Sequence, residues 1–118
     1  MYDRILVPTD GSDHAVRAAE HALALARAFD ATVRVIGVVD IQSVAGPFNA
    51  GGVDDEFVDG LRSQARESIE AVEALTDERV ETAVLEGTPA KSIVDDAADF
   101  DADLIVMGTH GRTGINRY

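Results

Sequence analysis

The sequence contains no cysteine, a single lysine and no long hydrophobic run, and each shortage narrows the possible functions. Without cysteine the chain can form neither a disulfide nor a thiolate metal site. No apolar run approaches the roughly 18 residues that a membrane-spanning helix needs. The segment from Met1 to Pro8 lacks the basic start and long apolar core of a signal peptide, which predicts a cytoplasmic protein without a membrane partner.

The charge is strongly acidic. Twenty-two Asp and Glu residues against ten Lys and Arg give a net charge of −12, and Lys91 is the only basic residue that is not arginine. The acids are spread along the chain, which indicates a solvated surface rather than an acidic tail. We expect no nucleic-acid partner, because phosphate contacts need a basic face. The composition resembles that of proteins from salt-loving archaea, although an acidic protein from an ordinary-salt organism fits it too.

Four short apolar runs predict strands, and three amphipathic stretches between them predict helices. The runs are rich in β-branched residues and lack strict alternation, which is typical of strands covered on both faces. The predicted strands are Arg4–Pro8, Thr32–Val39, Val80–Leu85 and Leu104–Met107. The predicted helices are 13–29, 57–75 and 89–100.

The helix boundaries carry their own signals. Ser12 and Thr88 are good N-cap residues, and Pro89 suits the first helical position. Periodicity predicts which residues of the second and third helices are buried. For the second helix these are Phe57, Leu61, Ala65, Ile69, Val72 and Leu75; for the third they are Ala90, Ile93, Val94, Ala97 and Phe100.

The order β-α-β-α-β-α-β predicts an α/β fold: an open, doubly wound parallel sheet with helices on both faces. The length of 118 residues predicts one domain, 1–118. Ligands of such sheets bind at the carboxyl edge, where the strand order reverses. If the first and fourth strands are neighbours there, the loops after Pro8 and Gly108 face each other across one crevice.

The exit of the fourth strand carries glycines at 108, 111 and 114. Such a loop leaves backbone N–H groups uncovered for phosphate oxygens, although a flexible turn is an equally simple interpretation. No Walker loop is present, and the first turn, Asp10 to Asp13, lacks the glycines of the dinucleotide-binding fingerprint.

Four motifs together are more specific than this spacing. They are Val-Pro-Thr-Asp-Gly-Ser at 7–12, Val-Val-Asp at 38–40, Gly-Thr-Pro at 87–89 and Asp-Leu-Ile-Val-Met-Gly-Thr-His-Gly-Arg-Thr-Gly at 103–114. In combination they resemble the universal stress protein family over essentially the whole chain. The resemblance implies an adenine nucleotide alpha-hydrolase-like, Rossmann-like domain, a homodimer and a role in the stress response.

One branch of that family binds ATP through Gly-x2-Gly-x9-Gly-Ser/Thr, and Gly108 and Gly111 match its first two glycines. The third glycine and the hydroxyl residue would fall at 121 and 122, beyond Tyr118. We therefore expect the last strand and helix of the domain to lie outside the given chain as well.

Carried over position by position, the resemblance places Pro8, Thr9 and Asp10 against the nucleoside and the main chain of Val38 at the adenine. The loop 108–114 would cover the ribose and the phosphates. The complete set of expected ATP-binding residues is Pro8, Thr9, Asp10, Val38, Met107, Gly108, Thr109, His110, Gly111, Arg112, Thr113 and Gly114.

Several of these residues have simpler roles open to them. Asp10 suits a ribose hydroxyl or the adenine amine, but it can also cap the first helix with Ser12. Arg112 can pair with phosphate or with a nearby acid, and His110 can bind phosphate or be structural. We expect any magnesium to be held largely by the triphosphate, because no carboxylate cluster lies on one loop.

The leading hypothesis is a nucleotide-binding regulatory protein with at most slow ATP hydrolysis, since no general base or metal site stands out. The main alternative is a dimeric interaction module of the same family that binds no nucleotide. A phosphoacceptor receiver domain would need a lysine after its last strand, and the sole lysine here lies in a helix. An adenylating enzyme would need Ser-Gly-Gly in the first turn, which is absent.

Overall fold

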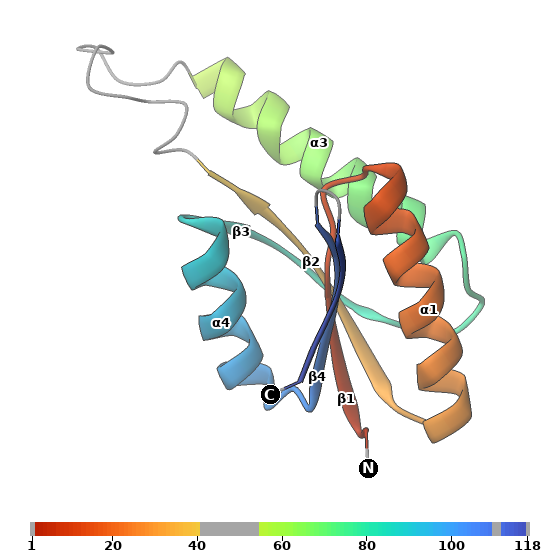
Figure 1. Ribbon diagram of the computed structural model, residues 1–118. Coiled ribbons are helices and arrows are strands. Elements are labelled where there is room, and N and C mark those ends of the chain that lie inside the picture. Colours follow the sequence, from red (N-terminus) through yellow and green to blue (C-terminus); the bar gives the residue numbers. More distant parts are fainter. Residues whose placement is uncertain (1, 41–54, 110–111, 118) are drawn as a thin grey trace.

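The computed structural model describes residues 2–40, 55–109 and 112–117 (Figure 1). As far as β4, strands and helices alternate along the chain as the hydrophobic pattern predicts. In order, they are β1 (Arg4–Pro8), α1 (Asp13–Phe29), β2 (Thr32–Val39), α3 (Asp55–Glu73), β3 (Glu81–Glu86), α4 (Pro89–Phe100), β4 (Leu104–Thr109) and β5 (Arg112–Arg117).

The sheet has the strand order β3-β2-β1-β4-β5, and the pairs β1–β2, β1–β4 and β2–β3 are parallel. The chain moves outward from β1 to β2 and β3, then crosses back to place β4 on the other side of β1. The order therefore reverses between β1 and β4, which confirms the predicted doubly wound fold and its switch point.

The end of the sheet differs from the prediction in one respect. The fourth strand does not stop at Met107 but continues to Thr109, and β5 pairs with it antiparallel, with Gly108 opposite Thr113 and Met107 opposite Gly114. The backbone of 112–114 is thus strand, where the sequence predicts a loop. The physical reason is that β4 would otherwise present a row of unpaired backbone groups at the edge of the sheet.

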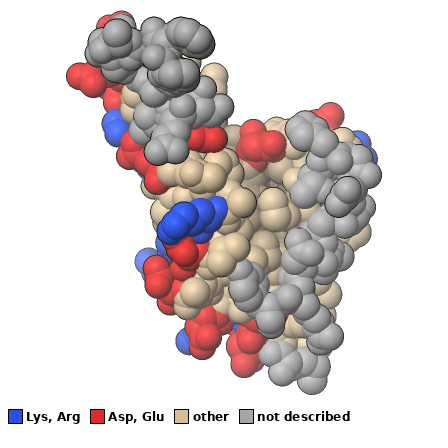
Figure 2. Space-filling view, turned by 60° about the vertical axis from the view of Figure 1, so that its left-hand side comes forward, with Lys and Arg blue, Asp and Glu red and all other residues tan. Residues whose placement is uncertain are grey.

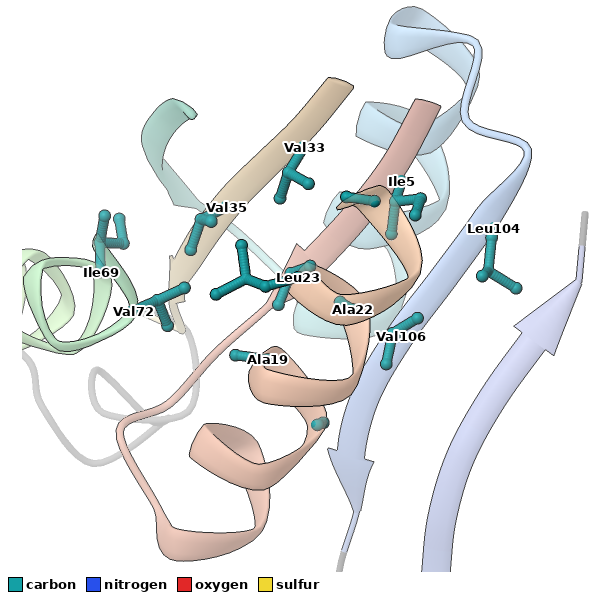
Figure 3. Close-up of a cluster of buried hydrophobic side chains, with 13 residues drawn as sticks. Ile5, Ala19, Ala22, Leu23, Val33, Val35, Ile69, Val72, Leu104 and Val106 are labelled. Carbon is teal, nitrogen blue, oxygen red and sulfur yellow. The ribbon is translucent and has the colours of Figure 1, made fainter. Parts of the chain in front are cut away.

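Helices cover both faces of the sheet, and each face has its own core. On one side α1 and α3 pack on β1, β2 and β4, and small side chains such as Ala19 and Ala22 let α1 lie close to the strands (Figure 3). On the other side α4 packs on β1, β2 and β3, and its Ala97 forms a second core cluster with Leu6, Ile36 and Ile105. The interiors of the central strands β1 and β4 are apolar because both their faces are buried, whereas β2 also carries Arg34.

Four residues predicted to be buried are exposed instead. Phe57 is 50% exposed, because α3 begins beyond the carboxyl edge of the sheet and its first turns have no strand beneath them (Figure 1). Leu75 lies past the end of α3 and is 38% exposed, and Val94 is 49% exposed on the outer side of α4. Ala90, on the same helix, is exposed too.

The helix ends follow the sequence signals. The Ser12 hydroxyl accepts a hydrogen bond from the Ala15 N–H at 3.2 Å, whereas Thr88 occupies the N-cap of α4 without a side-chain bond. Asp30 and Asp101 end α1 and α4 in the left-handed conformation, with φ of 54° and 60°. Within the described part of the chain, none of the helices combines the length and apolarity that crossing a membrane requires.

Candidate functional site

A pocket of about 240 Å³ opens at the switch point, on the side of the sheet that carries α4. It gathers the ends of β1, β2 and β4 together with the first turns of α1 and α4. Its lining consists of Pro8, Thr9, Asp10, Ala15, Val38, Pro89, Ile93, Met107 and Gly108. Six of these residues are ones that the sequence places in a nucleotide site, drawn from three segments far apart in the chain.

The turn after β1 is held by its own hydrogen bonds. The Thr9 N–H donates to the Ile36 carbonyl of β2 at 2.9 Å, and the Asp10 carboxylate accepts from the Ser12 N–H at 2.9 Å. Gly11 allows the reversal with φ of 81°, a conformation that favours glycine. Asp10 therefore caps the turn before α1, which is one of the two roles that the sequence allows, and it also lines the pocket.

Val38 brings backbone groups to this pocket. The β1–β2 register ends at Pro8 opposite Ile36, and groups two residues apart on a strand point to the same side. The N–H and C=O of Val38 consequently point to the β1 side of β2, beyond the last residue of β1 that pairs with β2. The neighbouring Val39 faces β3 instead, since its carbonyl accepts the Gly87 N–H at 3.0 Å.

Gly108 is a glycine for reasons of packing. A Cβ atom built there would lie 2.5 Å from the carbonyl carbon of His14 and 2.7 Å from the backbone nitrogen of Ala15. The end of β4 therefore touches the backbone of the first turn of α1, closer than any side chain permits. This contact also sets the positive end of the α1 dipole beside the pocket, which favours a negatively charged ligand group there.

The remaining predicted site residues lie elsewhere or are not described. Thr109, Arg112, Thr113 and Gly114 belong to the β4–β5 hairpin, for which the structure describes the backbone only. His110 and Gly111 lie outside the described residues. The pocket also includes Ala15, Pro89 and Ile93, which sequence reasoning missed, although the Gly-Thr-Pro start of α4 indicated that this helix begins at the same sheet edge.

A second hollow of about 310 Å³ lies on the opposite face, between the strand ends and α3. It shares Thr9, Asp10 and Val38 with the first pocket and adds Val39, Asp40, Leu61, Gln64, Ala65 and Ser68. Among the described residues, no group of three or more histidine or acidic side chains is placed to hold a metal ion. The chain as a whole is acidic, with a net charge of −12, and Figure 2 shows acidic side chains spread over one face with fewer basic ones among them.

A parallel sheet with a ligand-sized pocket at its switch point defines a doubly wound α/β protein of the kind that binds small molecules at its carboxyl edge. The chain belongs to the universal stress protein family, whose sequence model matches residues 1–118. The universal stress protein MJ0531 of Methanocaldococcus jannaschii is 41% identical over 120 residues, spanning 99% of this chain and 70% of that protein.

Solved structures agree with this assignment. A universal stress family protein from Burkholderia pseudomallei superimposes with a TM-score of 0.75 at 34% identity, covering 93% of this chain and 83% of the other. A universal stress protein in complex with cAMP superimposes with a TM-score of 0.62 at 26% identity, covering 90% of this chain and 72% of the other.

Proposed function

We propose that the protein is an ATP-binding regulatory protein of the stress response, and that the pocket on the α4 side of the switch point holds the adenosine. The observation that carries the proposal is the convergence of Pro8, Thr9, Asp10, Val38, Met107 and Gly108 on one pocket. A related universal stress protein at 26% identity was solved with a bound adenine nucleotide, cAMP, which supports this ligand class.

Each part of the pocket suits one part of the nucleotide. The apolar side chains of Pro8, Val38 and Met107 offer surfaces on which a flat heterocycle can lie. The N–H and C=O of Val38 form a donor–acceptor pair that complements N1 and the amino group of adenine. A carboxylate has room for several hydrogen bonds, so Asp10 can hold the Ser12 N–H and accept a ribose hydroxyl as well.

The phosphates would extend from this pocket toward Gly108 and the first turn of α1, where the helix dipole favours negative charge. Magnesium would be held largely by the phosphates themselves. We propose little or no hydrolysis, because Asp10 is the one ionisable side chain among the described residues of the pocket lining and it already serves the turn. ATP would then act by favouring one conformation, in a homodimer that light scattering would reveal.

The test is a calorimetric titration of the complete protein with ATP, adenosine and free adenine. Replacing Asp10 by Asn keeps an oxygen for the Ser12 N–H but removes the charge offered to the ribose. We expect ATP and adenosine to bind roughly tenfold more weakly to this variant, and adenine to bind as before, because a hydrogen bond to a charged group contributes about 1.5–3 kcal/mol.

The matched control is Asp99→Asn, which changes an exposed acid of α4 that does not line the pocket. Its affinity should equal that of the wild type. Failure of the wild-type protein to bind ATP would overturn the proposal and favour the interaction module without a nucleotide. Equal ATP affinity of Asp10→Asn and the wild type would remove Asp10 from the site.

A further inference from the structure

A buried ion pair joins α4 to the sheet just below the pocket. The Arg34 guanidinium of β2 donates two hydrogen bonds to the Asp96 carboxylate of α4, at 2.8 and 2.9 Å. A third contact, at 3.6 Å, runs from Arg34 to Glu81 on β3. The side chains of Arg34 and Asp96 are only 21% and 10% exposed, in a protein whose other acids are mostly at the surface.

Such a pair fixes geometry more than it adds stability. Desolvation of two charges offsets most of their attraction, and apolar replacements of similar size are often as stable. The planar guanidinium, by contrast, donates two parallel hydrogen bonds to a carboxylate in only one relative orientation. A two-bond contact therefore sets the rotation of the helix and its position along the sheet. The hydrogen bond to Asp96 also raises the pKa of Arg34 above its already high ordinary value.

The same helix forms one wall of the pocket. Pro89 and Ile93 line it, and Ile93 precedes Asp96 by three residues, which places both on the side of α4 that faces the sheet. Below them, Ala97 packs against Leu6, Ile36 and Ile105. Ile93 and Phe100 of α4 pack against the same cluster. Apolar contacts are non-directional, so they bury the inner side of α4 but set its rotation less narrowly than a two-bond ion pair does.

We propose that the Arg34–Asp96 pair is a positioning device for the nucleotide site, holding α4 so that Ile93 packs on the face of the adenine. The inference rests on the proposed function and adds to it a contact residue, Ile93, that lies outside the four motifs. It assigns Ile93 to direct contact with the base, and Arg34 and Asp96 to positions behind it, without contact with the ligand.

The adjacent aspartate provides a matched control. Asp95 also pairs with a cation, at 2.8 Å from Lys91, but that pair is exposed and lies within α4. Asp96→Asn and Asp95→Asn therefore make the same chemical change, one residue apart, in a buried and an exposed pair. For the contact residue, Ile93→Ala is compared with Val94→Ala on the outer side of the same helix, where Val94 is 49% exposed.

Affinities for ATP and adenosine are measured by calorimetry on the complete protein, well below the melting temperature of each variant. We expect Asp96→Asn to bind both ligands roughly three- to tenfold more weakly and Ile93→Ala roughly tenfold more weakly, because apolar contact with the ring is lost. The loss should be the same for ATP and adenosine, since the phosphates do not touch α4. Asp95→Asn and Val94→Ala should bind like the wild type.

A double variant, Arg34→Leu with Asp96→Leu, separates positioning from stability. We expect it to fold with near wild-type stability yet still bind adenosine several-fold more weakly. Wild-type affinity in this variant, or in Asp96→Asn, would overturn the inference while leaving the proposed function intact. A wild-type protein that binds neither ATP nor adenosine would overturn both, so the two failures are distinguishable.

Discussion

Replacing Gly108 by alanine should destabilise the protein markedly, whether or not a ligand is present. The added Cβ would meet the carbonyl carbon and oxygen of His14 at 2.5 and 2.6 Å, and the nitrogen of Ala15 at 2.7 Å. All three are backbone atoms in the first turn of α1, so no side chain can rotate away to relieve the clash. Either β4 or the start of α1 must move.

Overpacking of this kind costs about 1–3 kcal/mol, and we expect about 2–3 kcal/mol here because only backbone can yield. At about 4 °C per kcal/mol for a protein of this size, the melting temperature should fall by roughly 8–12 °C. Thermal unfolding followed by circular dichroism measures the shift without requiring any ligand.

Gly60 supplies a control of opposite sign. It lies within α3, and a Cβ built there meets nothing within 4 Å. Gly60→Ala should therefore stabilise the protein by about 0.5–1 kcal/mol, because alanine favours the helix. If Gly108→Ala melts at the wild-type temperature, the close contact between β4 and α1 is wrong, and Gly108 owes its identity to the ligand alone.

Three further predictions concern pairs and caps. Asp96→Ala should lower the free energy of unfolding, measured with urea, by about 1–3 kcal/mol, a figure reduced because its arginine partner is partly exposed. Asp95→Ala should change it by no more than about 0.5 kcal/mol, because that pair is exposed. Equal effects of the two substitutions would contradict the difference in burial. Ser12→Ala should cost about 1 kcal/mol and Thr88→Ala clearly less, since only the Ser12 hydroxyl accepts a capping hydrogen bond. The N–H groups of residues 3 and 4 lower the pKa of Asp103, so its stabilisation is complete above the unfolded pKa of about 3.9 and disappears as the pH falls through the lower folded value. Asp103→Asn should accordingly flatten the fall in urea midpoint between about pH 4 and pH 2, and an unchanged acid limb would exclude this role.

Much of the fold follows from local signals in the sequence. Apolar runs of strand length and the Ser12 and Pro89 boundaries place β1, α1, β2 and α4 within a residue of their observed limits. The alternation of strands and helices then leaves few topologies, and right-handed crossovers favour the observed one. The neighbourhood of β1 and β4, and with it the pocket, follows from that topology.

The missed features are those that depend on contacts between distant segments. Strand β5, Arg112–Arg117, has little apolar periodicity and forms because the edge of β4 offers it a partner. The Arg34–Asp96 pair joins residues 62 apart, and no local pattern marks it. The sequence alone does not distinguish a core position from a pocket-lining position for Ile93, because the two differ only in how α4 lies against the sheet.

The acidic surface leads to a last prediction, on the response to salt. A net charge of −12 on 118 residues means that surface acids repel one another, and α3 carries Glu67, Glu70 and Glu73 at three-residue spacing, all exposed. The Debye length falls from about 10 Å at 0.1 M to about 3 Å at 1 M, so added KCl should screen this repulsion and raise the melting temperature.

A variant with Gln at all three glutamate positions tests that cause directly. It should be more stable than the wild type at 0.1 M KCl, and the two melting curves should converge by about 1 M, where screening is nearly complete. A protein adapted to concentrated salt would continue to gain stability above 1 M, beyond what screening supplies, whereas an ordinary acidic protein would level off. A wild-type melting temperature that does not rise between 0.1 and 1 M would show that the acids are already balanced by local partners, such as Arg62 between Asp59 and Glu86, rather than by salt.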